Sequence, residues 1–135
     1  MKKDRPGVDK AGRTPLHYAA LNGDLAETVR LLASGLDPRA TDDNGFTPLH
    51  FATQSNSLSV SEALLGAGVE INAVDRNGNS PLSNAVFYSG GKGSLIALLL
   101  NAGADPDLEN FHGVSPIGLA RTMANPELIK FFDPA

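Results

Sequence analysis

The chain has 135 residues, a formal net charge of -4, 41% hydrophobic residues and no cysteine. The hydrophobic fraction is too high for a disordered chain, and without cysteine there is no disulfide, thiolate nucleophile or cysteine zinc site. The mild negative charge argues against nucleic acid as the main partner, because phosphate binding needs a large basic patch.

Neither a secretory signal nor a membrane span is indicated by the sequence. Two lysines follow the first methionine, but no apolar stretch comes after them. The longest uninterrupted apolar run, residues 95–100, is far shorter than the ~20 residues that a membrane span needs. We therefore expect a cytoplasmic protein without a membrane partner, monomeric by default.

Four short segments of the chain share one pattern, a glycine, any residue, threonine or serine, and proline. The prolines Pro15, Pro48, Pro81 and Pro116 are spaced 33, 33 and 35 residues apart. Threonine or serine before proline is typical of a helix N-cap, since proline at the first helical position loses no hydrogen bond. An acidic or amide residue three before each glycine favours a tight hairpin-like turn.

In chain order, the pattern predicts hairpin-like turns near residues 9–14, 40–47, 73–80 and 108–115. Each turn is followed by two short helices, eight in all, because the apolar stretches are only 7–10 residues long and Gly35, Gly68 and Gly103 stand where second helices should end. A unit this small cannot bury its apolar face alone, so we expect the units to stack.

These segments resemble the ankyrin-repeat family, whose pattern is Asp-x-x-Gly-x-Thr-Pro-Leu-His-x-Ala over 33 residues. Residues 9–19 and 42–52 match the pattern nearly completely, and the third and fourth copies keep part of it. The resemblance implies an all-α solenoid of stacked helix-turn-helix units with β-hairpin-like loops. It predicts one domain over residues 1–135, with repeats at about 9–41, 42–74, 75–109 and 110–135.

The copies depart from the family pattern in their C-terminal half. The resemblance gives His17 and His50 a structural role in hydrogen bonds within and between repeats, whereas Ser83 and Gly118 occupy this position later. The C-terminal half is therefore predicted to be the less stable half. The 35-residue spacing places a two-residue insertion around residues 89–93, expected to be a flexible loop between the helices of the third repeat.

The fifth residue after each repeat proline indicates where the array stops. Ala20, Thr53 and Val86 suit packing against a following repeat, whereas Arg121 does not. We therefore expect a complete, or nearly complete, array of four repeats.

The sequence contains no convincing catalytic or metal-binding motif. Residues 42–45 and 75–78 resemble calcium loops, but alanine stands where the first carboxylate is required. Residues 89–94 lack the order of a phosphate-binding loop, and no serine has the context of a nucleophile. We expect no enzyme activity, no cofactor and no metal site, and interpret the acidic residues 105–109 as a loop.

The resemblance further implies that a partner protein binds in a groove between the hairpin tips and the ends of the inner helices. The chain has six phenylalanines and two tyrosines, and four of these eight residues fall at such positions. Exposed aromatic clusters usually mark interaction sites. In the alternative interpretation, some of them pack between repeats as core. The candidate partner-binding residues are Arg13, Leu21, Asp43, Asn44, Phe46, Gln54, Arg76, Asn77, Asn79, Phe87, Tyr88, Phe111, His112, Val114 and Met123.

Three functional hypotheses remain open at this point. The first is a protein-binding module that acts as an inhibitor or immunity protein of a toxin or enzyme, as the resemblance to small free-standing bacterial ankyrin-repeat proteins implies. The second is a non-catalytic scaffold or regulatory subunit of an enzyme complex. The third is a regulator that binds a small molecule or a metal.

Overall fold

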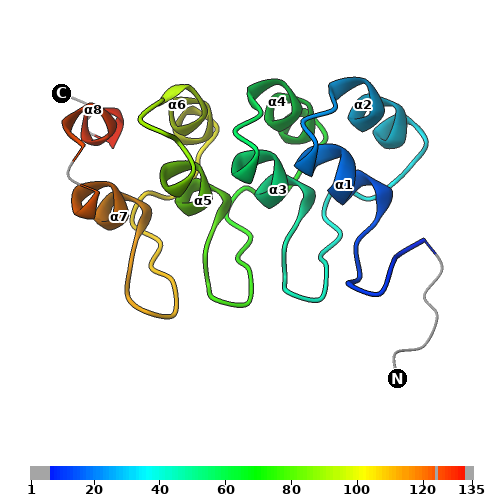
Figure 1. The fold of residues 1–135 in the computed structure, drawn as a ribbon, viewed down its shortest axis with the longest axis horizontal. Coiled ribbons are helices and arrows are strands. Elements are labelled where there is room, and N and C mark those ends of the chain that lie inside the picture. The colour runs from blue at the N-terminus through cyan, green and yellow to red at the C-terminus, as the bar shows by residue number, and fades with distance from the viewer. Residues whose placement is uncertain (1–6, 124, 133–135) are drawn as a thin grey trace.

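The structure is a computed structural model that describes residues 7–123 and 125–132, and it consists of stacked helix pairs (Figure 1). The first helices of the pairs are α1 (Pro15–Leu21), α3 (Pro48–Gln54), α5 (Pro81–Phe87) and α7 (Pro116–Thr122). The second helices are α2 (Leu25–Ala33), α4 (Leu58–Gly66), α6 (Ser94–Asn101) and α8 (Pro126–Ile129), which leads into the 3-10 helix η1 (Lys130–Phe132). The predicted all-α architecture with eight short helices is confirmed for the described residues.

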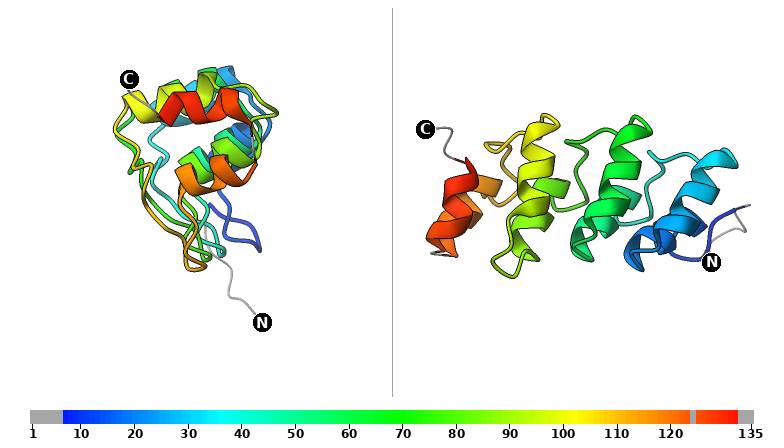
Figure 2. Two further views of the ribbon diagram at one scale, coloured as in Figure 1. Left: turned by 90° about the vertical axis from the view of Figure 1, so that its left-hand side faces the viewer. Right: turned by 90° about the horizontal axis from the view of Figure 1, so that it is seen from above.

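The helices form two layers (Figure 2). In the inner layer α1 packs against α3, α3 against α5 and α5 against α7, while α2, α4 and α6 pack in the same order in the outer layer. The hairpin turns project from the inner layer to one side of the stack (Figure 1). The inner helices and the hairpins thus form two walls that meet along the length of the array.

The predicted N-caps begin the inner helices. The side-chain oxygens of Thr47, Ser80 and Ser115 each accept a hydrogen bond from the backbone N–H three residues later. Proline follows each cap at the first helical position, where its fixed φ suits the helix. The threonine- or serine-proline pairs therefore determine where these helices begin.

Two buried histidines join neighbouring repeats, as the resemblance implied. The Nδ1 atoms of His17 and His50 accept hydrogen bonds from the N–H groups of Thr14 (2.9 Å) and Thr47 (3.1 Å). Their Nε2 atoms lie 3.1 Å and 2.9 Å from carbonyl oxygens of the next repeat. A carbonyl only accepts, so Nε2 carries the proton and the rings are neutral. Burial lowers the pKa of both imidazoles, which favours that neutral form.

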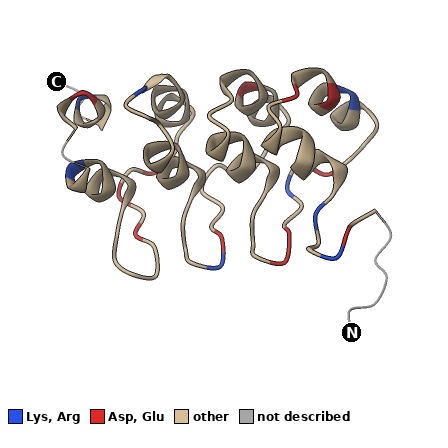
Figure 3. Cartoon of the chain, in the orientation of Figure 1, with Lys and Arg blue, Asp and Glu red and all other residues tan. Residues whose placement is uncertain are grey.

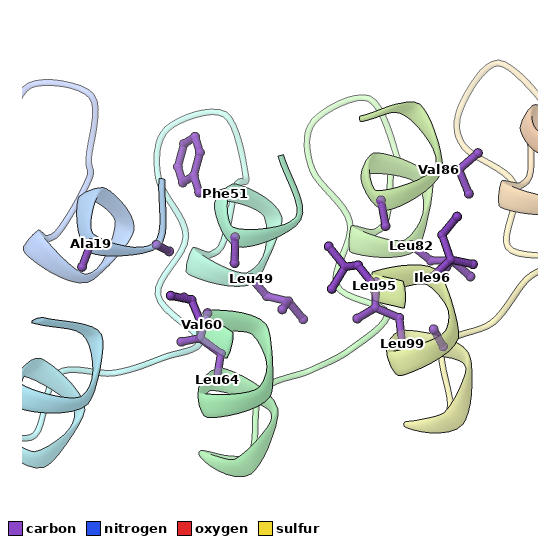
Figure 4. Close-up of a cluster of buried hydrophobic side chains, with 14 of the residues drawn as sticks. Ala19, Leu49, Phe51, Val60, Leu64, Leu82, Val86, Leu95, Ile96 and Leu99 are labelled. Carbon is purple, nitrogen blue, oxygen red and sulfur yellow. The ribbon is translucent and has the colours of Figure 1, made fainter. Parts of the chain in front are cut away.

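The hydrophobic core lies between the two layers (Figure 4). Leu49 of α3 and both Val60 and Leu64 of α4 are fully buried members of this core. Each such side chain contributes roughly 1.5–3 kcal/mol through burial. Leu82 of α5 and Ile96 of α6 repeat this arrangement in the third pair, with both side chains fully buried.

The insertion in the third repeat is buried at its two ends, whereas residues 90–92 between them are exposed. Ser89 is buried, and its hydroxyl donates a hydrogen bond to the Val86 carbonyl (2.9 Å). Gly93 lies against the ring of Phe131, so close that an added Cβ would be 1.9 Å from a ring carbon. Glycine at this position therefore lets η1 cover the start of α6, a long-range contact that the local sequence did not reveal.

Candidate functional site

The hairpin wall of the groove is held by a ladder of backbone hydrogen bonds from one tip to the next. The N–H of Asp43 donates to the carbonyl of Ala11 (2.9 Å), that of Arg76 to Asn44 (2.9 Å), and that of Phe111 to Asn77 (3.0 Å). Five of the predicted site residues take part in these hydrogen bonds, namely Asp43, Asn44, Arg76, Asn77 and Phe111. The ladder makes the hairpins a rigid, pre-organised surface.

The groove carries little charge (Figure 3). Helices α1, α3 and α5 contain no charged residue. Charged side chains stand at the tips of the first three hairpins, Lys10, Asp43 and Arg76, whereas the fourth tip carries Phe111 and His112. Helix α7 differs from these three in carrying Arg121 in its last turn.

Arg13 belongs to a network inside the array. Its Nε lies 3.2 Å from Oδ2 of Asp42, whose side chain is buried. Its guanidinium lies 4.9 Å from the ring centre of Phe51 and 5.7 Å from that of Tyr18. Tyr18 in turn donates a hydrogen bond to Asp9, which lowers the pKa of that carboxyl group. Arg13 therefore links the first two repeats.

Phe46 is less exposed than a free-standing anchor would be. Its ring packs against Phe51 (5.4 Å between centroids) and against His50 (5.7 Å). It is half-buried and contacts the hydrophobic core. The ring of Phe46 thus packs partly against the core, as the alternative interpretation proposed, and it also lines the groove pocket.

The other predicted residues on the inner helices differ in exposure. Leu21 at the end of α1 is half-buried and packs against the core. Gln54 at the end of α3 is half-buried, while Met123, which follows α7, is exposed. The apolar surface available to a partner therefore lies toward the C-terminal end of the groove.

A pocket of about 460 Å³ lies on the groove side of the third and fourth repeats. Its walls are the third and fourth hairpins and the faces of α5 and α7 beside them. It brings together seven predicted site residues, namely Phe46, Asn77, Asn79, Phe87, Tyr88, His112 and Val114. The remaining eight, Arg13, Leu21, Asp43, Asn44, Gln54, Arg76, Phe111 and Met123, lie outside it.

Two adjacent aromatic rings form one edge of this pocket. Phe87 and Tyr88 contact each other edge to face, with 4.9 Å between ring centroids. Phe87 is 61% exposed and Tyr88 is 42% exposed. Two large exposed rings side by side are typical of a surface that binds another molecule.

The family model for ankyrin repeats in three copies matches residues 16–110, which is more than half of the chain. The chain belongs to the ankyrin-repeat family. The fourth helix pair, α7 and α8, continues the same stack beyond the matched residues. No curated protein matches the chain. Ankyrin repeats are generic protein–protein interaction modules and are typically non-catalytic.

Five residues of the ankyrin-repeat pocket were not predicted from the sequence. Asp75 and Asn110 were interpreted only as turn residues, and Ser83 only as a lost histidine. Asn84 and Leu119 stand three residues after the repeat prolines, one turn before the positions that were chosen on the inner helices. The helical period provides the missing signal, because residues three or four apart share one face. All five line the pocket.

A second hollow, of about 730 Å³, lies at the N-terminal end of the array. Its lining includes Asp9, Arg13, Tyr18, Glu27 and Arg30. These charged groups pair with groups of the same chain, since Tyr18 bonds Asp9 and Arg30 bonds Glu27. The hollow is larger than the groove pocket, but its charged groups already have partners within the chain.

The described residues contain no group of three or more histidine, cysteine, aspartate or glutamate side chains that could hold a metal ion. Within the same residues, no helix has the length and apolar character that crossing a membrane requires.

Proposed function

We propose that this chain is a non-catalytic binding protein whose concave groove holds a partner protein over the second to fourth repeats, and that binding blocks the partner, as an inhibitor or immunity protein does. The pocket between the third and fourth repeats, edged by the exposed rings of Phe87 and Tyr88, carries this proposal.

The chemistry of the groove suits a protein partner. Protein interfaces are enriched in aromatic residues at their centre and surround them with polar groups. Here Phe87 and Tyr88 stand beside the amides of Asn77 and Asn84. The backbone ladder between the hairpins limits the conformational entropy that binding would otherwise cost.

We infer a steric effect on the partner, because the family is typically non-catalytic and a bound protein covers part of its partner's surface. A scaffold or regulatory subunit would use the same groove but leave the partner's activity intact or raise it. The two roles therefore differ in one measurable quantity, the activity of the bound partner.

The test is affinity capture from the source cells with three forms of the chain. The wild type and a control, Val29→Ala on the outer face of α2, should retain the same partner, because Val29 is exposed away from the groove. The double variant Phe87→Ala/Tyr88→Ala should lose it while keeping its melting temperature. Equal capture by all three forms would contradict the groove assignment.

The captured partner then decides the finer role. Its activity is measured with increasing amounts of wild-type chain and of the double variant. Inhibition by the wild type alone supports the inhibitor role. Unchanged or increased activity supports the scaffold or regulatory subunit instead.

A further inference from the structure

The pocket contains a buried carboxylate that lacks the cation present at the equivalent place one repeat earlier. In the second repeat, Oδ1 of Asp42 accepts the N–H groups of Asn44 (2.9 Å) and Phe46 (2.9 Å). Its Oδ2 faces the guanidinium of Arg13, whose Nε is 3.2 Å away. One oxygen therefore closes the turn and the other binds a cation.

Asp75 keeps the first of these arrangements and lacks the second. Its Oδ1 accepts the N–H groups of Asn77 (2.8 Å) and Asn79 (3.0 Å). The hairpin position of Arg13 is occupied by Phe46, which has no side-chain donor. Oδ2 of Asp75 receives no hydrogen bond or ion pair from any residue that the structure describes.

Asp75, which carries this oxygen, is only 5% exposed and lines the pocket. Among the described residues, no fully buried side-chain nitrogen or oxygen lacks a partner, so Oδ2 must reach solvent. A carboxylate held this deep with an open oxygen is complementary to a positively charged donor.

The missing histidine provides room in the same pocket, beside the fourth hairpin. Ser83 stands where His17 and His50 carry imidazole rings, and it also lines the pocket. In the first two repeats the ring reaches the carbonyl of Phe46 or Asn79. Val114, the equivalent residue of the fourth hairpin, accepts only the backbone N–H of Asn110 within the described chain. The small serine thus leaves open a space that a ring fills elsewhere.

The rest of the lining favours a planar cation. Among the residues that the structure describes, no lysine or arginine lines the pocket, so Asp75 gives this lining a negative charge. The side-chain oxygens of Asn77 and Asn84 are acceptors, and the rings of Phe87 and Tyr88 form one edge. A guanidinium combines five donors with a flat face that stacks on aromatic rings, whereas an ammonium is a compact point charge.

We propose that this pocket takes an arginine side chain of the partner protein, with its guanidinium paired to Oδ2 of Asp75. The proposal rests on the proposed function, because the arginine belongs to the protein held in the groove. Arg13 is the template within this chain, since it pairs with Asp42 and lies over the ring of Phe51. The partner's arginine would supply to Asp75 of the third repeat what Arg13 supplies to Asp42 of the second.

Asp75→Asn removes the charge with little risk to the fold. Asn110 holds the fourth hairpin in the same way, with its Oδ1 accepting the N–H groups of His112 (2.8 Å) and Val114 (3.0 Å). An asparagine at position 75 should therefore keep the turn and the melting temperature. The complementary variant Phe46→Arg places a guanidinium of the chain itself beside Asp75 and should occupy the site.

The direct test uses three capped pentapeptides that differ only in their central residue, which is arginine, lysine or citrulline. Binding is followed through the backbone amide signals of the wild-type protein in two-dimensional NMR. The arginine peptide should shift the signals of residues 75–84 and 110–119, with affinity at least tenfold above that of the citrulline peptide. Asp75→Asn and Phe46→Arg should abolish these shifts.

Several results would overturn the inference. They are equal binding of the arginine and citrulline peptides, undiminished binding to folded Asp75→Asn, shifts confined to the N-terminal hollow, or no binding at all. If the captured partner depends on Phe87 and Tyr88 but binds Asp75→Asn with unchanged affinity, the arginine pocket is refuted and the proposed function stands. If the double variant Phe87→Ala/Tyr88→Ala also captures the partner as well as the wild type does, the proposed function fails too.

Discussion

His50 hydrogen-bonds to the main chain of Asn79 across the boundary between the second and third repeats, with 2.9 Å between Nε2 and the carbonyl oxygen. Because Nδ1 of the same ring accepts the Thr47 N–H, the ring can fill both roles only in its neutral form. His17 makes the same link between the first and second repeats. Two of the contacts between neighbouring repeats therefore depend on neutral imidazole rings.

Acid should weaken these histidine hydrogen bonds between repeats and so lower the stability of the fold. Burial lowers the pKa of His17 and His50 below the usual value of 6.5, so below that pH the unfolded chain binds more protons than the folded chain. The free energy of unfolding should fall as the pH drops below about 6.5 and be constant above it. Urea unfolding at pH 5–8 measures this. A free energy that rises on acidification through this range would contradict the neutral-ring assignment.

The C-terminal repeats should open first at neutral pH. Ser83 and Gly118 replace the histidine there, and in a repeat array local weakness stays local. Hydrogen exchange with mass spectrometry should show faster exchange in residues 110–132 than in residues 42–66. The insertion 89–93 should exchange together with η1, because Phe131 covers Gly93. Uniform protection along the array would count against this prediction.

Phe46→Ala should lower stability as well as affect the groove. The ring packs against Phe51 and His50, and truncating a half-buried phenylalanine should cost about 2 kcal/mol of unfolding free energy. Phe111→Ala is the matched control, because its 73% exposed ring should cost no more than about 0.5 kcal/mol. Urea unfolding compares the two variants. Equal stability losses would mean that the packing of Phe46 contributes nothing.

Tyr88→Ala should separate binding from folding. The side chain is 42% exposed at the edge of the pocket, so its removal should change the unfolding free energy by no more than about 0.5 kcal/mol. If Tyr88 is an anchor, the dissociation constant for the captured partner should rise roughly 30-fold, or about 2 kcal/mol. Calorimetric titration and thermal melting on one sample measure both. Normal affinity, or a large loss of stability, would place Tyr88 outside the binding surface.

The sequence predicted the fold more fully than the site. Threonine or serine before proline determines a helix start locally, so the inner helices begin where the sequence predicts. The exposure of Phe46 could not be predicted, because it depends on the packing of its ring against Phe51 in the neighbouring helix. The covering of Gly93 by Phe131 joins residues 38 positions apart and has no local signal.

Asp75 shows why part of the site was missed. In the sequence it is one of several equivalent turn residues, and its Oδ1 behaves as such. Its distinct character comes from Phe46, one repeat earlier, which lacks the cation that Arg13 offers to Asp42. Such a difference becomes visible only when the chemistry of each repeat is compared with that of its neighbour in space.

The central claim is that the groove over the second to fourth repeats holds a partner protein. A hydrogen-exchange footprint of the complex tests this claim most directly. The amides of residues 75–88 and 110–119 should gain protection when the captured partner is bound, while helices α2 and α4 should be unchanged. Protection confined to the outer helices, with exchange around the pocket unaltered, would contradict the claim.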